Sequence, residues 1–185
     1  MVLSNIATAL NILVHCPEFA GLVPEVRVNL VYALPGAKNR FDVAAVDGRI
    51  TVVRGMPFAS GLPCFGSSDH MARLIIEARK FDPDINAGIN FKCDNSIIKV
   101  VRKYCTEHSL RFGCIDRKKE PEEVTRSDGA SMPWKVAELV RSSGGMPRLF
   151  YESEGWGKEP LFVCIGLDAI EVTGIAVDIA KRCTG

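Results

Sequence analysis

Residues 61–82, GLPCFGSSDHMARLIIEARKFD, contain the change of pattern that decides the fold class. The segment begins as a Gly/Pro-rich loop and continues with apolar residues at the i, i+3, i+4, i+7 spacing of one helix face. These apolar residues are Met71, Leu74, Ile75 and Ala78. We expect a helix over residues 68–81 with Ser67 as its N-cap, followed by a strand over residues 87–92, AGINFK.

The same alternation of helices and strands continues on both sides of this segment. Asp47-Gly48 between two apolar runs predicts a hairpin turn, so Arg49 opens the second hairpin strand. The other expected elements are a helix from Ser4 to about Pro17, strands 29–34, 42–46, 49–53, 110–116, 148–152 and 159–166, helices 95–108, 133–142 and 169–182, and a polar loop over 117–131. The pattern predicts one α/β domain over residues 1–185, with a mixed sheet covered by helices.

The composition and net charge of the chain indicate which class of ligand it binds. The 185 residues are 47% hydrophobic, the formal net charge is +1, and no run of five like charges occurs, which favours a small-molecule ligand over nucleic acid or a membrane surface. The N-terminal residues do not resemble a signal peptide, and no apolar run approaches the roughly 18 residues of a membrane span. We therefore expect a cytoplasmic protein.

The seven cysteines do not form a recognisable site in the sequence. They are scattered, odd in number and never in a CxxC pair, which argues against a zinc site and against a disulfide framework. Most lie within apolar runs, where a reduced cysteine behaves as a small hydrophobic residue.

The loop before the helix expected over residues 68–81 is a candidate anion-binding site. Free backbone N–H groups and the helix dipole favour negative charge at a helix start, so Gly66, Ser67, Ser68 and Asp69 are candidate phosphate-binding residues. His70 would face that anion, which would in turn support a protonated ring. The pattern fits equally a histidine that packs on the shoulder of an amphipathic helix.

Two further loops carry polar residues suited to phosphate. Asp116, Arg117 and Glu120 follow a buried strand, where open α/β sheets commonly bind ligands, and the two carboxylates suit a magnesium-bridged phosphate. Solvated surface charges explain them as well. In EGWGKEP (154–160), Gly155 and Gly157 would let the backbone and Lys158 approach a phosphate, although the loop departs from a Walker A sequence and also suits an ordinary strand connection.

Several segments together resemble the ThiN family of thiamine-phosphate synthases, a domain often fused behind a hydroxymethylpyrimidine phosphate kinase. The segments are LVPEVRVNLVYALPGAKNRFDVAAVDGRI, PCFGSSDHMARLIIEARKFDPDINAGINFK, DRKKEPEE and GWGKEP, in family order from about residue 5 to the end of the chain. The resemblance implies a three-layer α/β/α fold with a mixed, largely antiparallel sheet, similar to the class II aldolase/epimerase (AraD-like) superfamily.

The resemblance also implies a reaction and a set of site residues. Hydroxymethylpyrimidine pyrophosphate and hydroxyethylthiazole phosphate would be joined to give thiamine phosphate and pyrophosphate, with Mg²⁺ as cofactor. A homodimer is compatible with the sequence, which does not itself fix the assembly. Arg49 and His70 match the family's catalytic pair, and Asn29 joins the candidate substrate-binding residues. Family members that act as transcriptional regulators lack that pair.

Departures from the family pattern keep a second function open. Arg27 stands where many relatives carry glycine, and Trp156 stands where a smaller residue is usual. The alternative to a synthase is a non-catalytic domain that senses thiamine phosphates. An aldolase-like metalloenzyme would need a histidine cluster, whereas the chain has three histidines and no HxH pair.

Overall fold

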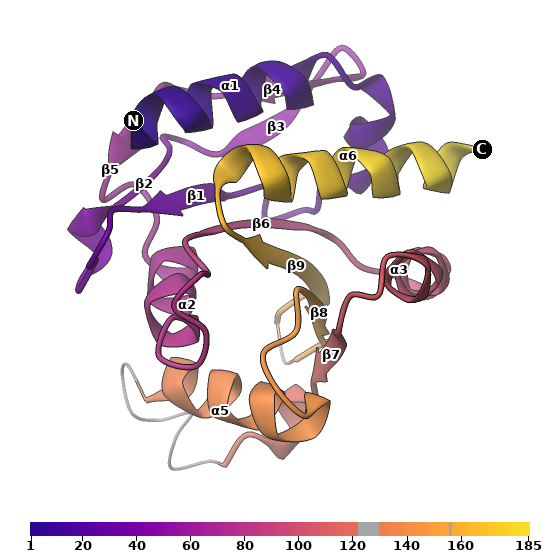
Figure 1. Cartoon of the computed structure of the whole chain (residues 1–185). Coiled ribbons are helices and arrows are strands. Elements are labelled where there is room, and N and C mark those ends of the chain that lie inside the picture. The colour runs from indigo at the N-terminus through magenta and orange to yellow at the C-terminus, as the bar shows by residue number, and fades with distance from the viewer. Residues whose placement is uncertain (122–129, 156) are drawn as a thin grey trace.

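A computed structural model describes residues 1–121, 130–155 and 157–185 of the chain (Figure 1). The helices are α1 (Val2–Val14), α2 (His70–Ala78), α3 (Asn95–Glu107), α5 (Ser131–Ser143) and α6 (Ala169–Thr184), with 3₁₀ turns η1 (Pro17–Leu22), η2 (Arg40–Asp42) and η3 (Arg117–Lys119). The strands are β1 (Leu30–Ala33), β2 (Val43–Val46), β3 (Ile50–Val53), β4 (Met56–Ala59), β5 (Pro63–Phe65), β6 (Ala87–Lys92), β7 (Phe112–Ile115), β8 (Leu149–Glu152) and β9 (Leu161–Gly166).

Seven of these strands form one mixed sheet in the order β5-β2-β1-β6-β9-β8-β7. Every neighbouring pair is antiparallel except β7 and β8, which run parallel at one edge. A separate two-stranded sheet joins β3 to β4. The predicted mixed α/β architecture is therefore present in the described residues.

Alternating strand residues divide the core between the two faces of the large sheet. Leu30, Ile89 and Phe162 pack on one face with apolar residues of α1, α3 and α6. Val31, Phe150 and Val163 pack on the other face with residues of α2 and α5. Figure 1 shows α1 and α6 side by side over the first face and α2 and α5 beyond the second, so the sheet lies between two helical layers.

Most expected elements lie close to their predicted places. The predicted strand 87–92 coincides with β6, and α3 begins at Asn95 because the Asp94 carboxylate caps it by accepting from the N–H groups of Ser96 and Ile97. The helices predicted over 133–142 and 169–182 are present as α5 and α6, with slightly different ends. Among the described residues, no helix has both the length and the hydropathy needed to cross a membrane.

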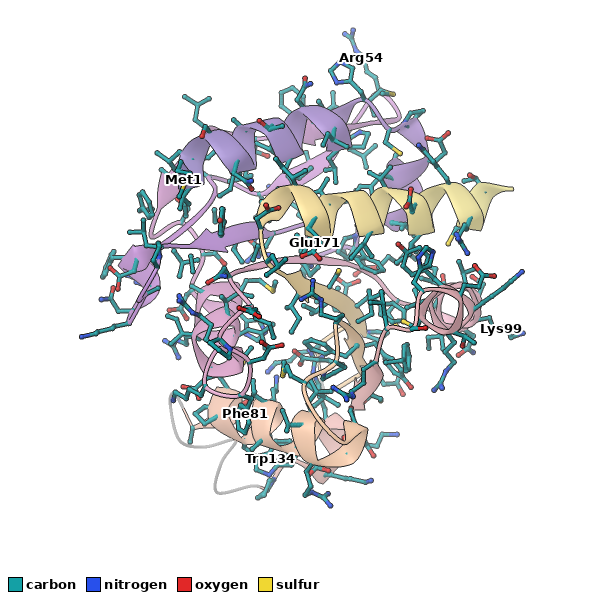
Figure 2. The ribbon with its side chains drawn as sticks, viewed as in Figure 1. Met1, Arg54, Phe81, Lys99, Trp134 and Glu171 are labelled. Carbon is teal, nitrogen blue, oxygen red and sulfur yellow. The ribbon has the colours of Figure 1, made fainter. Side chains whose placement is uncertain are left out.

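The predicted hairpin over residues 42–53 is wrong in its pairing. The turn itself is present, with Gly48 at φ 67° and the Arg49 N–H donating to the Val46 carbonyl. The strands on either side then diverge: β2 pairs with β5, and β3 pairs with β4. Figure 2 shows Arg54 at the tip of the β3–β4 hairpin, pointing away from the body of the molecule.

Two other predictions need correction. The helix expected over 68–81 begins only at His70 and has Asp69 in its N-cap position, so Ser67 is not the cap. The first helix, expected from Ser4 as its cap, begins earlier, at Val2, so Ser4 is not the cap. The predicted loop over 117–131 includes η3, and its residues 122–129 lie outside the described chain, as does Trp156.

Candidate functional site

The parallel pair at the sheet edge brings the ends of two strands together. Strands β7 and β8 finish at the same edge, with Glu152 as the last residue of β8 and Arg117 just beyond β7. Because side chains alternate along a strand, Glu152 shares the face of Phe150, which packs toward α2 and α5. Its carboxylate thus meets His70, the first residue of α2, and Lys135 of α5.

Glu152 is the centre of a buried charge cluster. Its Oε2 accepts hydrogen bonds from Arg117 Nε at 2.9 Å and Lys135 Nζ at 2.8 Å, and Arg117 Nη2 lies 2.8 Å away. Its Oε1 lies 3.7 Å from His70 Nε2. Glu152 is only 2% exposed and Lys135 only 3%, whereas more than half of the His70 side chain is open to solvent. The cluster is therefore closed on the sheet side and open at His70.

The ionised state of Glu152 is strongly favoured. Burial on its own raises the pKa of this carboxyl group, but the contact with His70 and the positive charges of Lys135 and Arg117 outweigh burial and hold the pKa well below its usual range. The carboxylate is consequently a permanent negative charge around which the three basic groups are arranged at neutral pH.

A pocket of roughly 230 Å³ opens over this cluster. Four basic side chains and two carboxylates line it, together with His70 and two amides; these are Arg49, Arg117, Lys135, Lys158, Glu152, Glu159, Asn29 and Asn90. Val26, Met71, Leu161 and Val163 supply apolar walls. The excess of basic over acidic groups suits an anionic ligand, and the apolar walls suit a ring.

The segment before β1 forms one wall of the pocket and is held from both sides. Arg49 Nη1 donates to the Val26 carbonyl, and Glu159 Oε1 accepts from the Val26 N–H at 2.7 Å. Asn90 Oδ1 accepts from the Asn29 N–H at 2.6 Å. These contacts tie residues 26–29 to three other parts of the chain and fix where Arg49 enters the pocket.

Six of the sequence-predicted site residues line this pocket: Asn29, Arg49, His70, Arg117, Gly157 and Lys158. Gly155 does not line this pocket, although its N–H and carbonyl pair with Lys158 and it lies against the Arg117 side chain. His70 faces Glu152 here, which sequence reasoning did not anticipate.

The other loop residues predicted for phosphate lie elsewhere. Ser67 Oγ is 2.7 Å from Cys64 Sγ, and the Asp69 carboxylate pairs with Arg73 at 3.1 Å. Gly66 packs against the ring of Phe41, and the buried Ser68 hydroxyl has no hydrogen-bond partner among the described residues. None of these four lines the pocket.

The predicted magnesium ligands do not come together in the pocket. Asp116 Oδ1 accepts from the Lys118 N–H at 3.1 Å, and Glu120 accepts from the Ser131 hydroxyl. The pocket's own carboxylates, Glu152 and Glu159, are already hydrogen-bonded. Within residues 1–121, 130–155 and 157–185, no group of three or more His, Cys, Asp or Glu side chains is arranged to hold a metal ion. This donor set does not fit a protein-built magnesium site.

Sequence reasoning missed Lys135, Asn90 and the roles of Glu152 and Glu159. Lys135 lies on the buried face of an amphipathic helix, and Glu152 ends an apolar strand. A charged residue at an otherwise apolar position was the available indication, because such a residue must find a partner. Which partner it finds depends on the fold.

Comparison with known proteins now gives the family. The family model described as thiamine-phosphate synthase ThiN matches residues 5–178. The chain belongs to the ThiN family. Over 182 residues it is 38% identical to the thiamine-phosphate synthase ThiN of Methanothermobacter thermautotrophicus, covering 98% of this chain and 94% of that protein. It is an enzyme of thiamine biosynthesis, a transferase that forms thiamine phosphate.

A fused relative shows a second arrangement of the same domain. The chain is 38% identical over 152 residues to the bifunctional thiamine biosynthesis protein ThiDN of Methanocaldococcus jannaschii. That match covers 82% of this chain and 34% of the longer protein.

Solved structures correct the expected fold class. The C-terminal domain of a phosphomethylpyrimidine kinase superposes with a TM-score of 0.86 at 30% identity, covering 98% of this chain and 97% of that one. A sugar-phosphate aldolase from Thermotoga maritima reaches only 0.53 at 11% identity. The assignment to a class II aldolase/epimerase (AraD)-like fold is therefore wrong, and the ThiN domain itself is the matching fold, although the mixed sheet between helical layers was predicted correctly.

Proposed function

We propose that the pocket over Glu152 joins hydroxymethylpyrimidine pyrophosphate to hydroxyethylthiazole phosphate, releasing pyrophosphate. The observation that carries this proposal is the pocket's composition: four basic side chains and His70 stand beside apolar side chains and two amides. Both substrates combine an anionic group with a ring, and the lining offers partners for both parts. Membership of the ThiN family supports the same chemistry.

The proposed step is a substitution at the pyrimidine methylene. The bond from this carbon to the pyrophosphate oxygen breaks, and the electron pair leaves with pyrophosphate. The cation left behind is stabilised by the amino group of the ring, and the thiazole nitrogen then donates its lone pair to form the new C–N bond. The protein's contribution is to hold the two rings together and to stabilise the leaving charge.

Each group of the pocket has a part in this proposal. Arg49 and Lys158 present positive charge to the departing pyrophosphate, and His70 donates to one of its oxygens. Asn29 and Asn90 lie where amides can hydrogen-bond the polar edge of a ring, and Met71 and Val163 pack against ring faces. Arg117 uses its guanidinium mainly inside the protein, on Glu152 and on the Glu159 carbonyl at 3.2 Å.

The proposed substitution is described without Mg²⁺, and the magnesium requirement stays a prediction. Mg²⁺ commonly keeps several waters and binds through substrate phosphates, so it would enter with the pyrophosphate rather than on a cluster of protein carboxylates. A homodimer and a cytoplasmic location likewise stay predictions.

The deciding experiment is a direct assay of the purified chain. Mixed with both substrates and Mg²⁺, it should produce thiamine phosphate and pyrophosphate in equal amounts. Omitting either substrate is the control. Tight binding of thiamine phosphate without any turnover would favour the sensing domain instead.

A further inference from the structure

Glu152 contacts groups from three separate parts of the chain, and all of them line the pocket. Arg117 follows β7, Lys135 belongs to α5, and His70 begins α2. Each partner and Glu152 itself contribute to the pocket lining. A movement of this one carboxylate would therefore displace three basic groups of the site together.

Stability alone is a weak reason for such a cluster. Removing a carboxylate and an ammonium group from water is costly, and well-packed apolar side chains of similar size often stabilise a core equally well. Phe150, two residues before Glu152 on the same face of β8, is apolar and packs in the core. The position of the buried charge is therefore better explained by the pocket, which Glu152 and its partners line, than by core stability.

The two oxygens of Glu152 have different surroundings. Oε2 accepts the bonds from Arg117 and Lys135, whereas Oε1 has the His70 ring at 3.7 Å. Hydrogen bonds in ligand-free sites are often long and shorten when the substrate binds. Oε1 is thus available to accept from His70 Nε2–H and to set the direction of the ring.

Building on the proposed function, we propose that Glu152 is a positioning residue for the synthase reaction. Its Oε2 fixes Arg117 and Lys135, and its Oε1 orients the imidazole of His70 toward the leaving pyrophosphate. Arg117 extends this scaffold by donating to the Glu159 carbonyl, next to Lys158. Because only 2% of Glu152 is exposed, it acts through these neighbours.

The first test is Glu152→Asp, which keeps the negative charge and withdraws it by one methylene. Because small displacements of catalytic groups are costly, kcat should fall at least about tenfold while KM for either substrate changes by less than about threefold. The melting temperature should move by only a few degrees. A folded variant with kcat within twofold of the parent would overturn the proposal.

The second test observes the ring directly by ¹⁵N spectroscopy of the histidines, of which the chain has three. Glu152→Gln should shift the His70 ring nitrogen signals away from the Nε2–H pattern, while His15 and His108 stay unchanged. If Glu152→Gln does not fold, Glu152→Asp serves for the same measurement. An unchanged His70 spectrum would contradict the orienting role.

Glu171→Asp is the matched control, because Glu171 also pairs with an arginine, Arg148, at 2.5 Å but does not line the pocket. It should leave kcat unchanged; a loss equal to that of Glu152→Asp would show a general packing effect and overturn the proposal. If the parent chain forms no thiamine phosphate, the proposed function fails, and the His70 spectrum decides the positioning role by itself.

Discussion

Two glutamates in different parts of the fold pair with arginine and serve different purposes. Glu171, labelled in Figure 2 at the start of α6, binds Arg148 through Oε1 and accepts from the Leu167 N–H at 2.6 Å through Oε2. Glu152 binds Arg117 and Lys135 through Oε2 and keeps Oε1 toward His70. The carboxylate of Glu171 stabilises the β9–α6 connection. The carboxylate of Glu152 is buried, and the basic side chains that it binds line the pocket.

The two glutamates differ in whether their binding partners line the pocket. Glu171 holds Arg148 and the Leu167 N–H, neither of which lines the pocket, whereas the three basic side chains that contact Glu152 all line it. Similar charge pairs can therefore stabilise a connection in one place and arrange a site in another. Substitutions in the two regions should separate these effects, because a change near Glu152 should lower turnover whereas a change near Glu171 should leave turnover unchanged.

The largest effect should come from Arg49→Ala. Removing this guanidinium from the pocket takes a positive charge from the leaving pyrophosphate, and kcat should fall by about 10²- to 10³-fold. The backbone strain does not change, since alanine and arginine tolerate φ 69° about equally poorly. Circular dichroism should show a folded protein. Near-normal turnover in that protein would remove Arg49 from the proposed mechanism.

His70→Asn should lower kcat by about a hundredfold with a change in melting temperature of only a few degrees. Asparagine keeps a donor but cannot carry a proton to the leaving group, and the exposed ring contributes little to the core. Turnover and thermal unfolding should be measured on the same preparation. Full activity with clearly lowered stability would instead assign His70 a packing role on the helix shoulder.

The sequence could predict features that depend on local contacts, but not features that depend on long-range packing. The start of α3 was predictable because its cap is local: Asp94 binds backbone groups two and three residues away. The turn at Asp47-Gly48 is equally local and was found, but the partners of its strands are set by long-range packing, and that pairing was missed. Arg49 became a candidate only through the family resemblance, whereas His70 was already a candidate from its place at the predicted helix start.

The Glu152 cluster could not be predicted in the same way. Its partners Lys135 and Arg117 are 17 and 35 residues away along the chain, and only the parallel β7–β8 pair and the packing of α5 bring them together. A glutamate at the end of an apolar strand marks a residue that needs a partner, without saying which one. The site was thus predictable as a set of loops and not as a charge network.

Acid should weaken the Glu152 region specifically. Because the folded state holds the pKa of Glu152 below its ordinary value of 4.5, its contribution to stability is present above that pH and is lost as the pH falls toward the folded-state pKa. The gap in the free energy of unfolding between the parent and Glu152→Gln should be largest at neutral pH, on the order of 3 kcal/mol, and should narrow progressively as the pH falls below 4.5. Urea titrations across this range measure it, and a gap independent of pH would contradict an ionised Glu152.

Lys158→Ala should have a smaller effect, confined to anion binding. The lysine lies beside Gly157 at the pocket, and its loss should weaken pyrophosphate binding by about tenfold. Stability should hardly change, because the side chain is not part of the core. Calorimetry with pyrophosphate measures the difference, and Lys99→Ala, on the outward-pointing side of α3 in Figure 2, is the surface control. Equal affinities in parent and Lys158→Ala would return the loop to an ordinary strand connection.

The smallest effect should follow Glu171→Gln, which tests the other side of the comparison. The pair with Arg148 is partly exposed, so its loss should lower the free energy of unfolding by about 1 kcal/mol or less, which for a chain of this size corresponds to a melting temperature about 2–4 °C lower. The glutamine can still accept the bond from the Leu167 N–H, which limits the damage to the connection. Because neither Glu171 nor Arg148 lines the pocket, kcat and KM should equal those of the parent. Thermal unfolding and steady-state kinetics on one preparation test both halves, and a drop in kcat without a drop in stability would mean that the β9–α6 connection also arranges the site.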